Sequence, residues 1–189
     1  MRPWTFIKSS PSVALLPEDI GQEIAIFGRS NVGKSSLINV LANQKKLAYT
    51  SSKPGCTIYL NCYQVHDELR VVDFPGYGYA KRSKSDVNLW HENVEEYLHE
   101  RNALKSIWLI LDARREVRQD DMLLIEALTN LEVPVLIVFN KVDQLKQKER
   151  HQAEKKHQAA LSCYKHLTIK YVSVFKGTGI EDLRLYLEA

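Results

Sequence analysis

Three absences narrow the classes to which this protein can belong. The longest apolar runs, 107–111 and 133–139, are too short to cross a bilayer, and the first eight residues contain no apolar core typical of a signal peptide. The three cysteines, Cys56, Cys62 and Cys163, form neither a disulfide framework nor a Cys-x-x-Cys metal pair. The C-terminus carries no lipidation motif. We therefore expect a cytoplasmic protein with reduced thiols and no membrane anchor.

The chain also lacks repeats, low-complexity blocks and a strong charge bias. Its 189 residues are 44% hydrophobic and 26% charged with a net charge of +3, which is ordinary for a globular domain and does not by itself indicate a nucleic acid as partner. We expect a monomer in which residues 1–21 form an N-terminal extension packed on a single domain, 22–189. Pro11 and Pro17 keep the extension out of a long helix.

One glycine-rich stretch fits the pattern G-x-x-x-x-G-K-[ST] of a phosphate-binding loop. It lies between a short apolar segment and a run with helical spacing, and its members are Gly28, Arg29, Ser30, Asn31, Val32, Gly33, Lys34, Ser35 and Ser36. Gly28 and Gly33 allow the backbone amides to converge on an anion. Lys34 can then reach the β- and γ-phosphates, and the Ser35 hydroxyl can bind Mg²⁺. The alternative is an accidental glycine turn before a helix.

A second phosphate-facing group is predicted after the apolar segment 69–72. Asp73 begins the pattern D-x-x-G with Gly76, so its carboxylate can hold Mg²⁺ through water while the Gly76 N–H meets a γ-phosphate. Upstream, Gly55 and Thr57 are further predicted phosphate contacts. Thr57 can also place its hydroxyl on Mg²⁺, although a threonine that simply begins a strand is the alternative. Lys34, Thr57 and Gly76 are thus the predicted catalytic groups.

The tetrapeptide Asn140-Lys141-Val142-Asp143 follows the apolar segment 135–139 and predicts a guanine site. The Asp143 carboxylate can accept N–H bonds from N1 and N2 of guanine, whereas adenine would leave it unpaired; such mismatches discriminate by about 10⁴–10⁵-fold. Asn140 can bind the other base edge or brace the phosphate loop, and the Lys141 stem can cover the base. A backbone N–H that meets guanine O6 is expected from Ser173, Val174 and Phe175.

The order of apolar and helical segments predicts an α/β fold. We expect a mostly parallel six-stranded sheet with helices on both faces, and one antiparallel edge strand supplied by the hairpin 57–65 and 69–72. Trp4, Phe6 and Ile7 can pack on this sheet or pair as an extra strand. Ligands in such sheets bind beyond the carboxyl ends of the strands. The remaining expected strands are 23–27, 106–111, 135–139 and 169–174, and the helices are 35–41, 86–100, 119–131, 147–162 and 180–188.

Taken in order, these motifs resemble a P-loop GTPase of the translation-factor class. Finer details resemble the EngB (YihA, YsxC) family of bacterial ribosome-assembly GTPases; they are 28–36, 53–57, 73–80, 111–114 and the opening 6–9. The resemblance implies binding of GTP and GDP with Mg²⁺, and an immature large ribosomal subunit as partner. Two departures are a Ser-Val-Phe sequence at 173–175 in place of a Ser-Ser or Ser-Ala start, and Cys56 where a lysine is common.

Tyr77 occupies the position where many GTPases have a glutamine that orients the attacking water. A phenol lacks the geometry of that amide, so we hypothesise slow intrinsic hydrolysis that a partner, a backbone group or an ion assists. The resemblance implies that Asn31 can help to bind K⁺ beside the phosphates, where a cation would offset developing charge. The alternative is that Asn31 only provides a left-handed turn.

The leading hypothesis is a switch in which GTP orders the loops around Thr57 and Gly76 and hydrolysis releases them. A membrane signalling GTPase that acts through a protein effector would need the missing anchor, and a nucleotide kinase would leave 140–143 unexplained. A nucleotide-binding module with little turnover is a further alternative. Basic residues at 81–84 and along 146–156 are either contacts for a ribosomal RNA backbone or solvated faces. Arg114 and Arg115 have the same two interpretations, and an intramolecular charge donor is a third.

Overall fold

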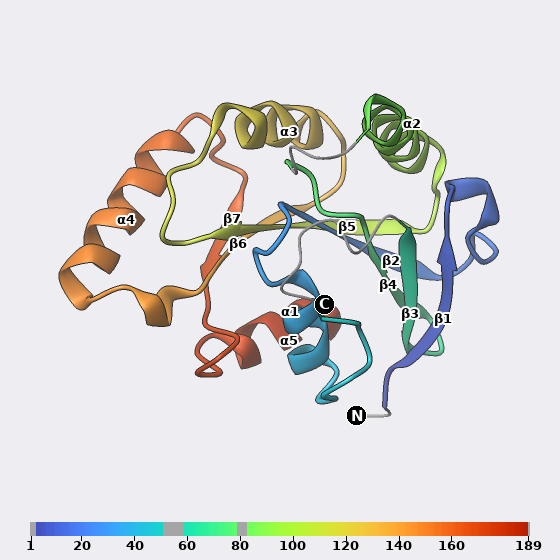
Figure 1. Ribbon diagram of the computed structural model, residues 1–189, viewed down its shortest axis with the longest axis horizontal. Helices are drawn as coiled ribbons and strands as arrows, with labels where there is room; N and C mark the ends of the chain where they lie inside the picture. The colour runs from blue at the N-terminus through green and yellow to red at the C-terminus, as the bar shows by residue number, and fades with distance from the viewer. Residues whose placement is uncertain (1–2, 51–58, 79–82, 189) are drawn as a thin grey trace.

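The computed structural model describes residues 3–50, 59–78 and 83–188 (Figure 1). Its strands are β1 (Thr5–Ser10), β2 (Gln22–Gly28), β3 (Leu60–His66), β4 (Leu69–Asp73), β5 (Leu104–Asp112), β6 (Val135–Asn140) and β7 (Thr168–Tyr171). Its helices are α1 (Lys34–Leu41), α2 (Lys84–Glu100), α3 (Gln119–Thr129), α4 (Gln147–Ala160) and α5 (Ile180–Glu188), with short 3₁₀ turns η1 (Val13–Leu15) and η2 (Val142–Gln144). No helix within the described ranges has the length and apolar character needed to cross a membrane.

The sheet has the strand order β1-β3-β4-β2-β5-β6-β7. Its five strands from β4 to β7 run parallel, while β3 pairs antiparallel with both β4 and β1. The predicted α/β class and the antiparallel hairpin are confirmed. The sheet has seven described strands rather than the expected six, because 5–10 pairs along the outer side of β3. The edge of the sheet is therefore β1, and β3 lies inside it.

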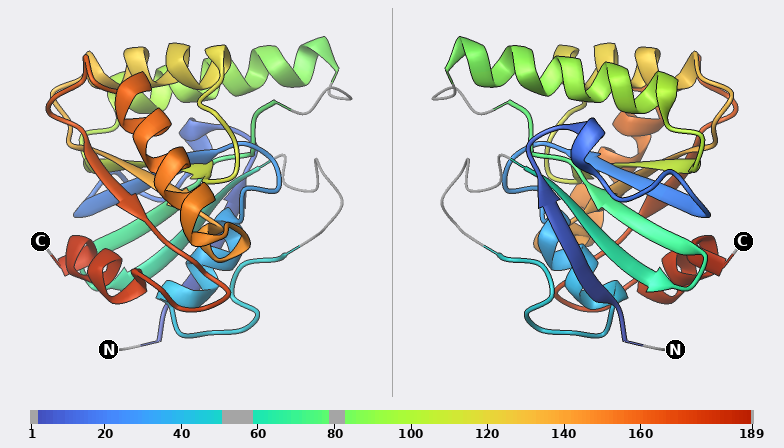
Figure 2. Two further views of the ribbon diagram at one scale, coloured as in Figure 1. Left: turned by 90° about the vertical axis from the view of Figure 1, so that its left-hand side faces the viewer. Right: turned by 90° about the vertical axis from the view of Figure 1, so that its right-hand side faces the viewer.

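Each face of the sheet carries its own apolar core. Helices α2 and α3 cover one face, and α1 and α5 cover the other (Figures 1 and 2). Val94 and Tyr97 of α2 and Ile125 of α3 pack into the first core, whereas Leu37 of α1 and Leu183 of α5 pack into the second. Near-continuous apolar runs are typical of parallel strands that are buried on both faces. In β2, Ile24–Phe27 is such a run and is completely buried.

A buried ion pair joins the start of the sheet to the N-terminal segment. The Glu23 carboxylate accepts a bond from the Arg101 guanidinium at 2.7 Å and another from the Tyr97 hydroxyl at 2.8 Å. Arg101 also donates to the Pro17 carbonyl at 2.7 Å. Because buried charges need such partners, this cluster holds the end of α2, the start of β2 and the segment before Gln22 in one arrangement.

Several element ends differ from the sequence prediction, and two of the differences have a clear local reason. Helix α2 begins at Lys84 rather than at residue 86, because the Ser83 hydroxyl accepts the Asp86 N–H and the Asp86 carboxylate accepts the Ser83 N–H. Strand β7 ends at Tyr171 rather than at 174, because the backbone then turns and Ser173 N–H bonds to the Thr178 carbonyl. The second change brings Ser173 toward the candidate site.

Candidate functional site

Four neighbouring parallel strands end at residues of the predicted site or directly beside it. Strands β4, β2, β5 and β6 lie side by side and end at Asp73, Gly28, Asp112 and Asn140. The carboxyl ends of parallel strands share one edge of a sheet, so these four positions meet there. The fold thereby brings the phosphate loop, the D-x-x-G segment and the predicted base motif together.

The phosphate loop spans the turn from β2 into α1 and depends on its glycines. A Cβ at Gly28 would lie 2.5 Å from the Ile110 carbonyl oxygen, and one at Gly33 would lie 2.5 Å from Nδ2 of Asn140. Gly33 has φ +103° and is the N-cap of α1. Asn31, within the loop, also has a left-handed backbone, with φ 64°. The backbone path therefore requires glycine at both positions.

Asn140 and Lys141 bind the phosphate loop directly. The Asn140 amide donates to the Val32 carbonyl at 3.0 Å, and its own oxygen accepts the Val174 N–H at 3.2 Å. The Lys141 ammonium donates to the Asn31 carbonyl at 2.6 Å. Of the two roles that the sequence leaves open for Asn140, the structure has the brace between the base motif and the phosphate loop.

Two further predicted base contacts, Asp143 and Ser173, lie beside each other. The Ser173 hydroxyl donates to the Asp143 carboxylate at 2.5 Å and accepts the Lys176 N–H at 2.9 Å. Asp143 is exposed in η2, whereas the Ser173 side chain is buried. The Phe175 side chain is 83% exposed, so it contributes no wall to the site. An open carboxylate held by a hydroxyl is a suitable acceptor for a pair of N–H donors.

Lys34 and Asp73 form a buried pair at the base of the phosphate loop. The Lys34 ammonium lies 3.9 Å from Oδ1 of Asp73, which is within ion-pair range but beyond hydrogen-bond distance. Burial raises the pKa of Asp73 to about 6, against the opposing charge of Lys34. Among the described residues, no group donates a hydrogen bond to Asp73 Oδ1. A buried anionic oxygen in this state suits a cation.

The segment after Asp73 lies against the phosphate loop. A Cβ at Gly76 would come within 2.9 Å of the Ser30 amide nitrogen, so only glycine permits this approach. The Ser30 N–H donates to the Tyr77 carbonyl at 3.1 Å, and the Tyr77 N–H donates to the Gly28 carbonyl at 3.3 Å. The other two predicted phosphate contacts, Gly55 and Thr57, lie outside the described residues.

The Tyr77 side chain points toward α3. Its hydroxyl donates to Oδ1 of Asp121 at 2.8 Å, and the side chain is buried. Arg29 of the phosphate loop binds the same carboxylate at 3.2 Å, and its guanidinium lies 5.5 Å from the centre of the Tyr77 ring. Burial and the nearby Asp121 charge raise the pKa of Tyr77, so the phenol stays protonated and acts as a donor.

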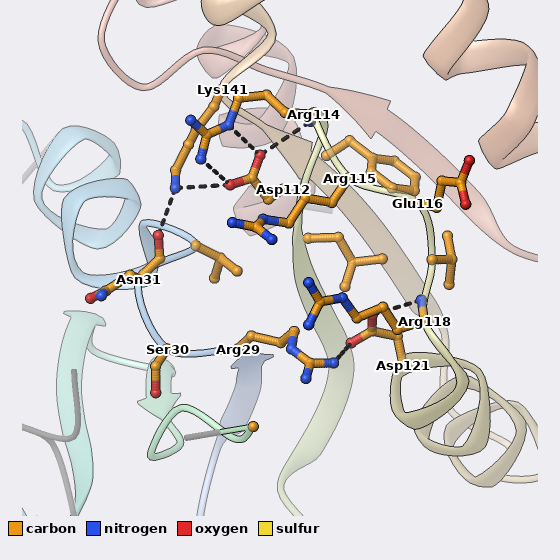
Figure 3. Close-up of a pocket in the computed structure, with 15 residues that line it drawn as sticks. Arg29, Ser30, Asn31, Asp112, Arg114, Arg115, Glu116, Arg118, Asp121 and Lys141 are labelled. Carbon is orange, nitrogen blue, oxygen red and sulfur yellow. Dashed lines mark hydrogen bonds and ion pairs between the residues drawn. The ribbon is translucent and has the colours of Figure 1, made fainter. Parts of the chain in front are cut away.

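A pocket of about 270 Å³ lies beside the phosphate loop and carries several arginines (Figure 3). Asp112 accepts bonds from the Arg114 guanidinium at 2.6 Å and the Lys141 ammonium at 3.0 Å. Although burial acts to raise it, these bonds lower the pKa of Asp112 to about 2. Arg114 is thus occupied by an ion pair. The other basic side chains of the pocket are Arg29, Arg115 and Arg118.

Sequence reasoning assigned no role to Asp112 or Asp121. Asp112 carries a usable signal, since it ends an apolar strand as Asp73 does. Asp121 lies in the first turn of α3, where an acidic residue is common in any helix. Its partners Tyr77 and Arg29 are distant in the sequence, and nothing local distinguishes it.

The chain matches known proteins over most of its length. Residues 23–141 match the family model described as 50S ribosome-binding GTPase. The chain is 40% identical over 185 residues to a "Probable GTP-binding protein EngB" of Blochmanniella pennsylvanica, covering 96% of this chain and 93% of that protein. A protein of the same name from Thermotoga petrophila is 42% identical over 167 residues, covering 88% and 85%. The chain belongs to the EngB family of GTP-binding proteins. The family model that it matches is a GTPase model, and this protein is a GTPase.

Solved structures agree with the EngB fold. A crystal structure of a probable GTP-binding protein EngB superposes with a TM-score of 0.64 at 23% identity, covering 87% of this chain and 96% of that one. Era, crystallised with MgGDPNP and nucleotides 1506–1542 of 16S ribosomal RNA, gives a TM-score of 0.66 at 27% identity and covers 89% and 56%. The P-loop GTPase domain predicted from the sequence is therefore confirmed.

Proposed function

We propose that this GTPase is a guanine-nucleotide switch that assists assembly of the large ribosomal subunit in the cytoplasm. The observation that carries the nucleotide part is the direct bonding of Asn140 and Lys141 to the carbonyls of the phosphate loop. A base-reading motif and a phosphate-reading motif that are bonded together can position two ends of one ligand. In this proposal residues 22–189 are the GTPase domain, and 1–21 are an extension packed on it.

We assign the ligand contacts by motif. The phosphates bind to 28–36, Gly55, Thr57, Asp73 and Gly76, while guanine binds to Asn140, Lys141, Asp143 and the 173–175 loop. The Ser35 and Thr57 hydroxyls would hold Mg²⁺ directly, and Asp73 would hold it through water. The buried Asp73 oxygen without a hydrogen-bond donor supports this fit, as does the MgGDPNP complex of Era. When bound, Mg²⁺ neutralises phosphate charge and orients the phosphate oxygens.

The chain's own groups perform the remaining parts of hydrolysis. The Lys34 ammonium and the loop amides stabilise charge on the β- and γ-phosphates, and the Gly76 N–H orients the γ-phosphate. Tyr77 is engaged by Asp121, so its side chain does not position the attacking water. Intrinsic hydrolysis is therefore slow. The Asn31 side chain would help to hold a K⁺ ion, which would supply part of the missing charge stabilisation.

The ribosomal part of the proposal is supported by the 50S description of the family model and by charge. The pocket beside the phosphate loop contributes Arg115 and Arg118, whose guanidinium groups suit phosphate oxygens of an RNA backbone, whereas Arg29 and Arg114 are already paired with Asp121 and Asp112. Because this pocket adjoins the phosphate loop, RNA contact and nucleotide state act on the same segment. A protein with this cycle binds its subunit as a monomer in one nucleotide state and leaves in the other.

Sedimentation of cell extracts tests this proposal. In a non-hydrolysable GTP analogue we expect the protein to co-sediment with a precursor of the large subunit, and in GDP to remain at the top of the gradient. Asp143→Asn, which removes the guanine acceptor, should stay at the top in both conditions. Absence of the wild-type protein from every ribosomal particle in both nucleotides would refute the ribosomal role and leave nucleotide binding untouched.

A further inference from the structure

A groove of about 990 Å³ lies between α2 and α3, on the face of the sheet away from α1 and α5. We call it the α2–α3 groove. One wall carries Trp90, Val94 and Leu98 of α2, the other carries Leu123 and Leu124 of α3, and Tyr77 lies at one end. Of the residues assigned above to phosphate or guanine, Arg29 lines the groove, and none provides its apolar walls. The groove is a second concave surface of the domain.

Part of the apolar lining of this groove is open to solvent, while Trp90, Leu98 and Leu124 are partly buried against the core. Leu123 is 59% exposed and Val87, at the α2 side, is 40% exposed. Helix α2 has 17 residues but buries only Asn93, Val94 and Tyr97, so most of its length lacks a covering partner within the described residues. Contiguous apolar surface in a concavity is characteristic of a binding groove, whereas single exposed leucines are not.

The charge around the groove identifies its occupant. Helices α2 and α3 together carry eight carboxylates and one lysine, a formal charge of −7 in a chain whose net charge is +3. Glu95 and Asp120 belong to the groove lining itself, as does Arg29, which pairs with Asp120 at 3.3 Å. RNA phosphates would be repelled from this face, while a basic peptide would be attracted. The arginine-rich pocket beside the phosphate loop has the opposite character.

We propose that the α2–α3 groove binds an amphipathic, lysine- or arginine-rich helix of a partner protein. The apolar side of that helix enters between Trp90 and Leu123, and its basic flank faces Glu95 and Asp120. Two helices running side by side form the walls (Figure 2), which suits recognition of a helix through residues spaced three and four apart. The occupant also contacts Tyr77, the residue after Gly76. Its binding therefore depends on the arrangement of the segment that adjoins the phosphate loop.

Fluorescence anisotropy with a designed probe tests the proposal. The probe is a fluorescein-labelled peptide of leucine and lysine, 18 residues long, with leucines at helical spacing. Two comparison peptides have the same composition in scrambled order, or glutamate in place of lysine. We expect the helical lysine peptide to bind at least tenfold more tightly than either, and to weaken with added NaCl because the attraction is partly Coulombic. Equal binding of the three peptides would overturn the proposal.

Substitutions locate the bound peptide. Leu123→Ser removes an apolar contact and Glu95→Lys reverses a charge of the groove; each should raise the peptide Kd at least tenfold. The matched controls are Leu185→Ser and Glu188→Lys on α5, where Leu185 is 64% exposed. The controls should remain within about twofold of wild type. All four side chains are exposed, and unchanged urea unfolding verifies that each variant folds.

Other occupants give distinct results. Displacement of the peptide by a short RNA would identify RNA as the occupant of the groove and overturn the proposal. A concentration-dependent dimer that Leu123→Ser dissociates would identify a second copy of this chain as the occupant, with the same consequence. Equal peptide binding by the groove and control variants would also overturn the proposal. The peptide is titrated without nucleotide, so a failure here is separable from a failure of guanine recognition.

Discussion

The hydroxyl of Tyr77 lies 2.8 Å from Oδ1 of Asp121, and this bond ties the loop after β4 to the first turn of α3. Arg29 of the phosphate loop binds the same oxygen at 3.2 Å, and the Arg118 N–H binds Oδ2 at 3.0 Å. One carboxylate thus holds three segments that are distant in the sequence. The Tyr77 hydroxyl is thereby directed toward α3, with the Arg29 guanidinium lying over the ring.

The first prediction concerns the role of Tyr77. Tyr77→Phe should change kcat for intrinsic GTP hydrolysis by less than about threefold, because the phenol does not position the water. It should still lower the free energy of unfolding by about 1–3 kcal/mol, because Asp121 loses a buried donor. Single-turnover phosphate release and urea denaturation measure the two effects. Hydrolysis largely abolished by Tyr77→Phe or Tyr77→Ala would mean that Tyr77 is itself the positioning group.

The second prediction compares two glycines that share a left-handed backbone. Gly33 has φ +103° and a Cβ there would lie 2.5 Å from Nδ2 of Asn140, whereas Gly177 has φ +72° and no atom within 4 Å. Gly177→Ala should cost only the strain of the backbone, about 1–2 kcal/mol. Gly33→Ala should cost more and should also abolish GDP binding. Retained GDP affinity in Gly33→Ala would show that the brace from Asn140 is dispensable.

The third prediction concerns monovalent ions. Hydrolysis by the wild-type protein should be several-fold faster in KCl than in NaCl at equal ionic strength. Asn31→Gly preserves the left-handed turn, φ 64°, and the carbonyl that Lys141 binds, and removes only the side chain. We expect this variant to hydrolyse GTP equally in both salts. Identical wild-type rates in KCl and NaCl would dismiss the potassium site.

The fourth prediction concerns pH and His157 of α4. Its ring is buried, stacks on Phe139 at 3.9 Å and contacts the Arg115 carbonyl at 2.8 Å. Burial lowers the pKa of His157, although the Arg115 carbonyl, Glu154 and Glu116 act in the opposite direction. The unfolded chain therefore takes up a proton first as pH falls. Stability is fully present above the unfolded pKa of about 6.5 and declines below it.

Urea unfolding between pH 5 and pH 8 measures this effect. The contribution of one histidine has a limiting slope of about 1.4 kcal/mol per pH unit. His157→Phe keeps an aromatic ring on Phe139 and should flatten the decline below pH 6.5. His151→Gln on the same helix, where His151 is exposed, should leave the decline as in wild type. A slope that His157→Phe does not change would assign the acid sensitivity to other groups.

The sequence predicted the parts of the fold that have local signals. Helix α5, Ile180–Glu188, has the predicted bounds because apolar residues recur at helical spacing, and the buried strands follow their apolar runs. The sequence does not decide whether β1 packs or pairs, because Phe6 and Ile7 are exposed and the segment is fixed by pairing with β3. Pairing between distant segments leaves no periodic pattern in either.

The candidate site divides in the same way. The phosphate loop and Asn140–Asp143 are contiguous motifs, so the role of each residue can be predicted from the sequence. Asp121 has no such signal, because its importance comes from Tyr77 and Arg29, 44 and 92 residues away in the chain. The groove between α2 and α3 was equally hidden, since its walls look like two ordinary amphipathic helices until their separation is known.

The central claim is that Asp143 reads the guanine of a nucleotide held by the 28–36 loop. Isothermal titration calorimetry in Mg²⁺ should show tight binding of GDP and GTP to the wild-type protein. Asp143→Asn should weaken GDP by at least 100-fold and prefer xanthosine diphosphate, which presents a carbonyl where guanine has its 2-amino group. No heat with GDP or GTP, or unchanged GDP affinity in Asp143→Asn, would contradict the account.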